Sequence, residues 1–105
     1  MGCGGTYGIN FTSRTDPRIE EIELRVRSDG FTVGDLVRDS VAGIGGLDGS
    51  PPDEIEVSWL TEGKRYKKKL QTPEMPRGVR GVIQVEFLGG DQVRASFVKS
   101  GYQGG

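Results

Sequence analysis

Hydrophobic residues alternate with polar ones in two segments of the first part of the chain, and this period of two is typical of half-buried β-strands. The segments cover residues 7–11 and 21–27, and a turn with Asp16-Pro17 separates them. Their apolar positions are Tyr7, Ile9, Phe11, Ile22, Leu24 and Val26. We therefore expect two strands, joined by their short connection into an antiparallel hairpin.

The spacing of hydrophobic residues changes between residues 33 and 44. Here the apolar positions fall at helical intervals and predict one apolar stripe. They are Val33, Leu36, Val37, Val41 and Ile44. Thr32 is a candidate N-cap, and Asp35 stands three residues later, as in a capping box. The glycines from Gly43 onward would end the helix.

The second half of the chain returns to alternation and predicts four more strands in two hairpins. The strands cover residues 55–59, 65–70, 83–87 and 93–97, with loops at 47–53 and 72–81. The turns are Thr61-Glu62-Gly63 and Gly89-Gly90-Asp91. Trp59 and Tyr66 would pack against each other across the first hairpin. One amphipathic helix against a mixed sheet gives the α+β class, with two layers.

Length and charge suggest one small domain without a charged partner. The chain has 105 residues, which fits a single domain. We expect this domain over 7–99, between a flexible segment at 1–6 and a flexible tail at 100–105, where glycines are frequent. The formal net charge of −1 favours neither nucleic acid nor a membrane surface.

The chemically reactive residue types are scarce. There is no histidine, so the usual general base and the commonest metal ligand are missing, and we expect neither an enzyme nor a metal or cofactor site. Cys3 is the single cysteine, which cannot form an internal disulfide and indicates a reducing compartment. No apolar run approaches the ~20 residues of a membrane span, and the amino end does not have the layout of a secretory signal. We expect a cytoplasmic protein.

Several short motifs, in this order along the chain, resemble the ubiquitin family. Phe31–Val37 is similar to the helix entry of ubiquitin and of its sulfur-carrier relatives, and Ser50–Asp53 is similar to the Pro-Pro-Asp turn. Gly63-Lys64 has a counterpart with a chain-linking lysine, and Gly90–Val93 resembles the entry to the last strand of the sulfur carriers. The resemblance covers residues 7–105 and implies a ubiquitin-like β-grasp, with a mixed sheet packed on one main helix and an extra strand hairpin.

The chain also departs from ubiquitin. Residues 72–91 supply a strand that ubiquitin lacks, and Tyr102-Gln103 stand where ubiquitin carries a basic residue before its glycines. Ser58 falls near the position of ubiquitin's recognition patch and is polar. These differences fit a divergent bacterial ubiquitin-like protein with an activating enzyme of its own.

The resemblance implies a function for the terminal Gly104 and Gly105. In the family an activating enzyme adenylates the terminal carboxylate, and a conjugating enzyme transfers it to a target. We therefore expect a protein modifier whose partners are an adenylating activating enzyme, a conjugating enzyme, a deconjugating peptidase and target proteins. Lys64 would be an acceptor lysine. The alternatives are a sulfur carrier with a C-terminal thiocarboxylate and a non-conjugated β-grasp binding or scaffold module.

Two features leave further alternatives open. The basic run comprises Lys64, Arg65, Lys67, Lys68 and Lys69. These residues could be attachment sites for further modifier chains, or they could bind nucleic acid. Because the net charge is near zero, we prefer the interpretation of a solvated strand face that protects a sheet edge. Gly2 and Cys3 fit a sequence pattern for acylation. The alternative, which we favour, is an unstructured N-terminal segment with an unreactive thiol.

Overall fold

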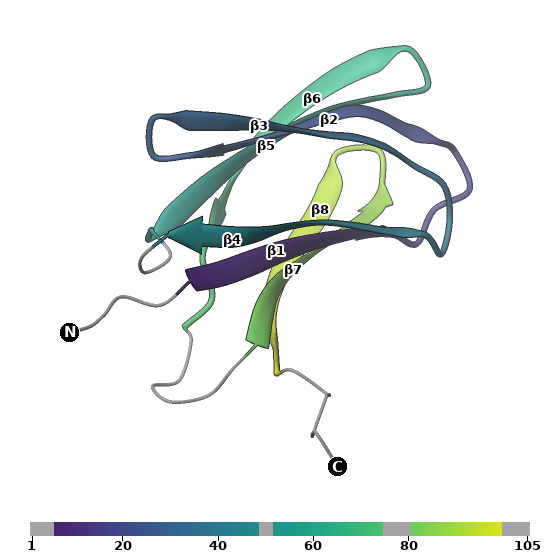
Figure 1. Ribbon diagram of the computed structural model, residues 1–105. Helices are drawn as coiled ribbons and strands as arrows, with labels where there is room; N and C mark the ends of the chain where they lie inside the picture. The colour runs from purple at the N-terminus through teal and green to yellow at the C-terminus, as the bar shows by residue number, and fades with distance from the viewer. Residues whose placement is uncertain (1–5, 49–51, 75–80, 100–105) are drawn as a thin grey trace, which may run out of the picture.

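A computed structural model of the protein describes residues 6–48, 52–74 and 81–99, and all regular structure in these ranges is β-strand. Figure 1 shows the eight strands. Their bounds are β1 (Thr6–Ser13), β2 (Ile19–Val26), β3 (Asp29–Leu36), β4 (Val41–Asp48), β5 (Glu54–Thr61), β6 (Lys64–Gln71), β7 (Gly81–Gly89) and β8 (Gln92–Lys99).

The strands form two four-stranded sheets that stack on each other as a β-sandwich (Figure 1). Sheet A has the order β4-β1-β7-β8, and sheet B has the order β3-β2-β5-β6. Within sheet A, β1 and β7 run parallel, while every other neighbouring pair in both sheets is antiparallel. Consecutive strands pair as hairpins at β2–β3, β5–β6 and β7–β8.

The core lies between the sheets, where the alternating apolar positions of both meet. Trp59 is fully buried, with its ring centroid 5.1 Å from that of Phe87 and 5.6 Å from that of Tyr66. The indole nitrogen of Trp59 donates a hydrogen bond to the Gly90 carbonyl at 3.3 Å, which ties the β7–β8 turn to sheet B. The predicted contact between Trp59 and Tyr66 is confirmed: the two residues are register partners.

The predicted helix is wrong, and with it the α+β class and the β-grasp. Residues 29–48 form β3, a corner and β4 instead. The segment holds Gly34, Gly43, Gly45 and Gly46, and each glycine costs a helix about 1 kcal/mol relative to alanine. The β-branched valines of the segment also favour strand. Phe31 and Val33 show the period of two, and they pack against the core.

The predicted capping box does not form either. Gly34 adopts a φ of +107° inside β3, in a region that other residues rarely enter. The Asp35 carboxylate accepts a hydrogen bond from the Glu21 backbone N–H of the neighbouring strand at 3.0 Å. Asp35 therefore joins β3 to β2, and does not cap a helix.

The predicted hairpin of the first two strands is also wrong. β1 lies in sheet A and β2 lies in sheet B, so the connection with Asp16-Pro17 carries the chain from one sheet to the other. Ile9 and Leu24 are both buried between the sheets. Alternation gives the buried face of each strand correctly, but it does not specify which strand lies beside it.

A corner at residues 37–40 brings the chain back from sheet B to sheet A. The Asp39 N–H donates to the Ser13 carbonyl at 3.0 Å, and Thr12 Oγ1 donates to the Ser40 carbonyl at 3.0 Å. Arg38 pairs with Asp16 at 2.7 Å. These contacts fix the start of β4 beside β1.

The ends of the chain lie largely outside the described residues. Of the expected flexible segment 1–6, Thr6 is described and begins β1, whereas the tail 100–105 is not described. No helix long and apolar enough to cross a membrane occurs in residues 6–48, 52–74 and 81–99.

Candidate functional site

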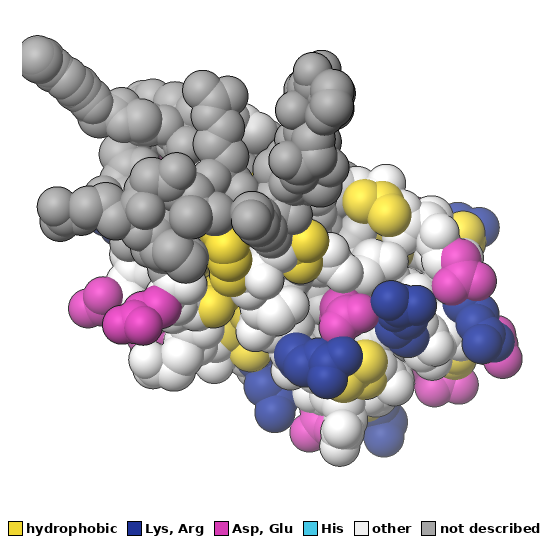
Figure 2. Space-filling model, turned by 90° about the horizontal axis from the view of Figure 1, so that it is seen from below, with side chains coloured by type: hydrophobic (Ala, Val, Ile, Leu, Met, Phe, Trp, Pro, Cys, Tyr) yellow, Lys and Arg dark blue, Asp and Glu magenta, His cyan; other side chains and the backbone are white. Residues whose placement is uncertain are grey.

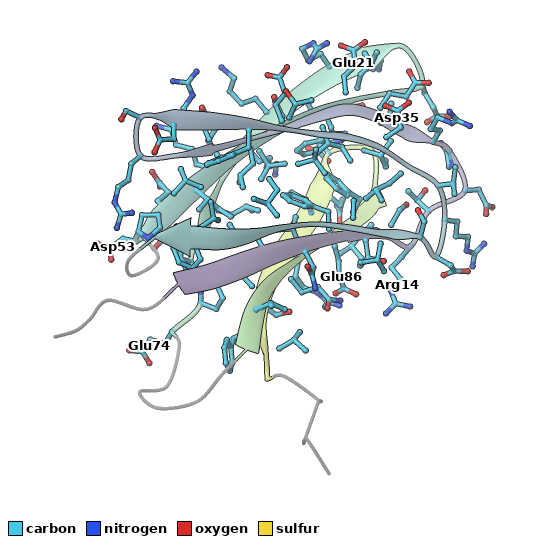
Figure 3. All side chains as sticks on the ribbon, in the orientation of Figure 1. Arg14, Glu21, Asp35, Asp53, Glu74 and Glu86 are labelled. Atoms are coloured by element: carbon cyan, nitrogen blue, oxygen red, sulfur yellow. The ribbon has the colours of Figure 1, made fainter. Side chains whose placement is uncertain are left out.

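The outer face of sheet B is densely charged. Neighbouring strands place Glu23 beside Ser58 and Arg25 beside Glu56, and β6 adds Lys67 in the row of Ser58. Many of the charges are paired: Arg65 with Glu21 at 2.6 Å, Arg25 with Glu56 at 3.9 Å, and Arg18 with Asp35 at 3.8 Å. Figure 3 shows Glu21 and Asp35 at this sheet.

A shallow depression of about 230 Å³ lies on this charged face. Gly30 and Ser58 leave room between longer side chains of the adjacent strands. The depression is lined by Glu23, Leu24, Arg25, Gly30, Phe31, Thr32, Glu56, Ser58 and Lys67. Its rim carries both acids and bases, so it presents no single charge that would select a ligand.

The outer face of sheet A is different, because its middle carries no charged side chain among the described residues. Asn10 has Gly43 as its register partner on β4 and Gln84 as its partner on β7, which in turn faces Ser96 on β8. The next row pairs Val82 with Val98. The uncharged positions on this face are Gly8, Asn10, Thr12, Val41, Gly43, Gly45, Val82, Gln84, Ser96 and Val98.

Exposed hydrophobic side chains also lie on this face, in separate rows of the sheet. Val41, Leu88 and Val98 are 66%, 40% and 38% exposed, and all three point away from the core. The remaining large hydrophobic residue exposed in the described ranges is Val37, in the corner just before β4. Figure 2 looks at the molecule from this side and shows hydrophobic and uncharged surface next to a group of acidic and basic side chains.

A cluster of charged side chains lies toward one end of this face, and its carboxylate is satisfied internally. Glu86 on β7 is 6% exposed and lies between two arginines. Its Oε2 accepts a hydrogen bond from Arg14 Nε at 3.1 Å, and its Oε1 accepts from Arg94 at 2.7 and 3.1 Å. Figure 3 shows Arg14 and Glu86 side by side at sheet A. The Arg94 hydrogen bonds, helped by Arg14, lower the pKa of Glu86, although burial opposes them.

The titratable groups offer little reactivity. Arg14 and Arg94 hold the carboxylate oxygens of Glu86 in hydrogen bonds, and the lowered pKa favours the ionised form. Glu86 is therefore a poor proton acceptor. Burial raises the pKa of the Tyr7 phenol, which Arg27 partly offsets. No group of three or more metal-ligating side chains occurs in the described ranges.

Of the residues predicted to carry function, Lys64 is described, and it lies on sheet B and not on this face. Gly104 and Gly105 lie outside the described residues, as do Gly2 and Cys3. Lys64 is exposed where β6 begins, directly after the Glu62-Gly63 turn. The basic run is exposed on β6, an edge strand of sheet B, so the predicted solvated strand at a sheet edge is confirmed, and its role in protecting that edge stays a prediction.

The sheet A face was missed because hydrophobic periodicity directs attention to inward positions. The signal was present in the outward ones: Gly8 and Asn10 alternate with the core residues of β1, and Gln84 and Ser96 do so on β7 and β8. The outward positions of β2 are instead Glu23 and Arg25. Interface cores are depleted of charged residues, so neighbouring strands with uncharged outward positions make this face a candidate for contact.

Fold and surface together define a small two-sheet β-sandwich with one densely charged outer face and one whose middle is uncharged. No family model and no curated protein matches the chain. A solved structure that matches it is an NMR structure of a protein from Eubacterium rectale, with a TM-score of 0.63, 15% sequence identity and 94% of each chain covered. That likeness supports the sandwich architecture alone.

Proposed function

We propose that the protein is a non-catalytic binding module that contacts another protein through the outer face of sheet A. The observation that carries the proposal is the contrast between the two outer faces. The partner would present a flat surface with few charges, because only such a surface matches the uncharged rows around Asn10 and Gln84.

The physical argument rests on desolvation. Covering a charged face removes water from each ion, at a cost that imperfect pairing across an interface does not recover. The outer face of sheet A avoids this cost in its middle, and burying Val41 and Val98 adds about 25 cal/mol per Å² of apolar surface removed from water. Uncharged centres with apolar contacts are typical of interface cores.

The end of the face with Glu86 supplies a polar rim. Arg14 and Arg94 remain about 60% exposed in their side chains while they hold the carboxylate. Two guanidinium groups that share one carboxylate leave a net positive charge at this end. A partner with a carboxylate at the matching margin would gain hydrogen bonds there without breaking the existing ones.

The expectation of a ubiquitin-like modifier is not carried forward, because it depended on a β-grasp with a main helix. A sandwich without that helix removes the structural basis of the resemblance. The third alternative was a non-conjugated β-grasp binding or scaffold module. Its β-grasp fold is wrong as well, and only the general idea of a binding module agrees with the proposal.

Site-specific photo-cross-linking in the native cell tests the proposal. A photoreactive side chain is placed at Ser96 on sheet A or, as the matched control, at Ser58 on sheet B. Both serines are half-buried and point to the outer face of their sheet. We expect a discrete protein adduct from position 96 only. The adduct from position 96 should also disappear when Gln84→Lys is added. Adducts from position 58 alone, or equal adducts from both positions, would overturn the proposal.

A further inference from the structure

The four edge strands of the sandwich differ in how they are protected against pairing with another strand. The edges are β4 and β8 in sheet A and β3 and β6 in sheet B. An edge strand exposes backbone N–H and C=O groups, and proteins usually protect it with charges, bulges or strained backbone. Comparing the four edges shows where a strand could be added.

Three edges carry such protection. β6 has five basic residues, which would repel a copy of themselves. β3 begins with Asp29, ends beside Asp35 and contains the irregular backbone of Gly34. β8 presents Arg94, which is engaged with Glu86 at the outer face. Two copies of any of these strands would bring like charges together.

The first half of β4 carries no such device. Residues Val41–Ile44 pair regularly with Thr12, Phe11, Asn10 and Ile9 of β1, and none of the four is charged. The irregularity of β4 comes later, where Gly45 and Gly46 stand opposite the single Gly8. Among the large hydrophobic residues that the structure describes, Val41 is also the most exposed.

We propose that this edge pairs antiparallel with the same edge of a second copy of the chain. Identical strands related by a two-fold axis bring each side chain near its own type or near a close neighbour in sequence. Residues 41–44 meet that condition without like-charge repulsion, since they are Val, Ala, Gly and Ile. This self-compatibility favours a second copy over an extended segment of another protein.

The assembly would join the two A sheets into one continuous sheet with the order β8-β7-β1-β4-β4-β1-β7-β8. In an antiparallel pair with a two-fold axis perpendicular to the sheet, both outer faces lie on the same side. The dimer would therefore present two uncharged faces next to each other. The inference does not depend on the proposed function, because β4 can pair whether or not the face binds a partner.

The test replaces Val41 and Gly45 by lysine in the full chain. Val41 is 66% exposed, and a Cβ at Gly45 would meet no atom within 4 Å, so the monomer tolerates both changes. The matched control is Gly30→Lys with Thr32→Lys on β3, because a Cβ at Gly30 also meets nothing within 4 Å and Thr32 is exposed. Both double variants add the same charge to an edge strand.

Sedimentation equilibrium over the micromolar range gives the oligomeric state. We expect a concentration-dependent dimer for the wild type and the β3 variant, and a dimer dissociation constant raised at least about tenfold for the β4 variant. A wild-type monomer at every concentration would overturn the inference. So would a dimer that survives in the β4 variant, or one that both variants weaken equally.

A second measurement needs no variant. Hydrogen exchange of the wild type at two concentrations should show amide protection in β4 that rises with concentration, with unchanged protection in β3 and β6. Equal protection at both concentrations contradicts strand pairing through β4. Ser96→Lys lies on β8, at the opposite edge of sheet A from β4, so it should leave the dimer intact. This variant therefore distinguishes dimer formation through β4 from partner binding by the outer face of sheet A.

Discussion

At the residue scale, Glu86 is a buried carboxylate whose stability contribution depends on pH. Its pKa is lowered in the folded protein, first by the hydrogen bonds of Arg94 and also by Arg14. A carboxyl group with a lowered folded pKa stabilises the fold above its unfolded pKa of about 4.3, and this stabilisation is lost as the pH falls through the folded value. The two arginines are largely exposed, so solvent screening reduces the effect.

We therefore expect Glu86→Gln to lower the free energy of unfolding by about 1–2 kcal/mol at pH 7. The deficit should be smaller at pH 3, because the wild-type carboxyl gains protons as the pH falls toward its lowered pKa. Urea unfolding at both pH values, followed by the fluorescence of the single Trp59, measures the difference. A deficit that is equal at both pH values would show that the ion pairs contribute nothing.

Gly81 is a residue that the packing of β8 requires to be small. A Cβ at this position would lie 2.5 Å from the Phe97 ring and 2.5 Å from the Val98 carbonyl oxygen. We expect Gly81→Ala to lower the free energy of unfolding by about 1–3 kcal/mol, because the strand must shift to admit the methyl group. Gly45→Ala is the control, since it meets no atom within 4 Å, and it should leave thermal stability unchanged or slightly raised. Equal melting temperatures for both variants would contradict this packing.

At the element scale, the β5–β6 hairpin turns through two residues with positive φ. Glu62 has a φ of 52° and Gly63 a φ of 78°, between the paired Thr61 and Lys64. This is the backbone of a type I′ turn, which prefers Asn-Gly. Glu62→Asn should therefore raise the free energy of unfolding by about 0.5–1 kcal/mol. Thermal denaturation measures the gain, and Glu62→Val, with a β-branched residue, should lower the stability instead.

Strands were predictable from the sequence where one face is buried and the turn is short. The β5–β6 and β7–β8 hairpins, with Trp59 opposite Tyr66, followed from alternation and turn residues. The prediction for residues 33–44 was wrong because the apolar positions of this segment also fit a helical period. These positions are Val33, Leu36, Val37, Val41 and Ile44. Local spacing does not reveal that a corner at 37–40 lets the two halves lie in different sheets.

The partners of β1 could not be predicted for a related reason. It pairs with β4 and β7, which follow it by about 30 and 70 residues in the chain, and such pairings depend on the packing of the whole domain. The uncharged outward positions of β1, β7 and β8 were visible in the sequence. They became one face only when the sheet order placed these strands next to each other.

At the scale of the whole molecule, the sandwich divides its surface between two faces of different chemistry. Sheet B turns paired acids and bases to water, and sheet A turns valines, glycines and amides outward. The first face favours solubility and the second favours contact with a surface of few charges. Placing one charge on each face in turn should therefore have unequal consequences for binding.

The most direct measurement is the affinity of Ser96→Lys and Ser58→Lys for the partner that cross-linking at position 96 identifies. Both substitutions replace a half-buried serine on an outer face. Titration calorimetry should give a dissociation constant raised at least about tenfold for Ser96→Lys, which corresponds to about 1.4 kcal/mol, and unchanged for Ser58→Lys. Unchanged affinity for Ser96→Lys, or a larger loss for Ser58→Lys, would contradict the assignment of sheet A as the binding face.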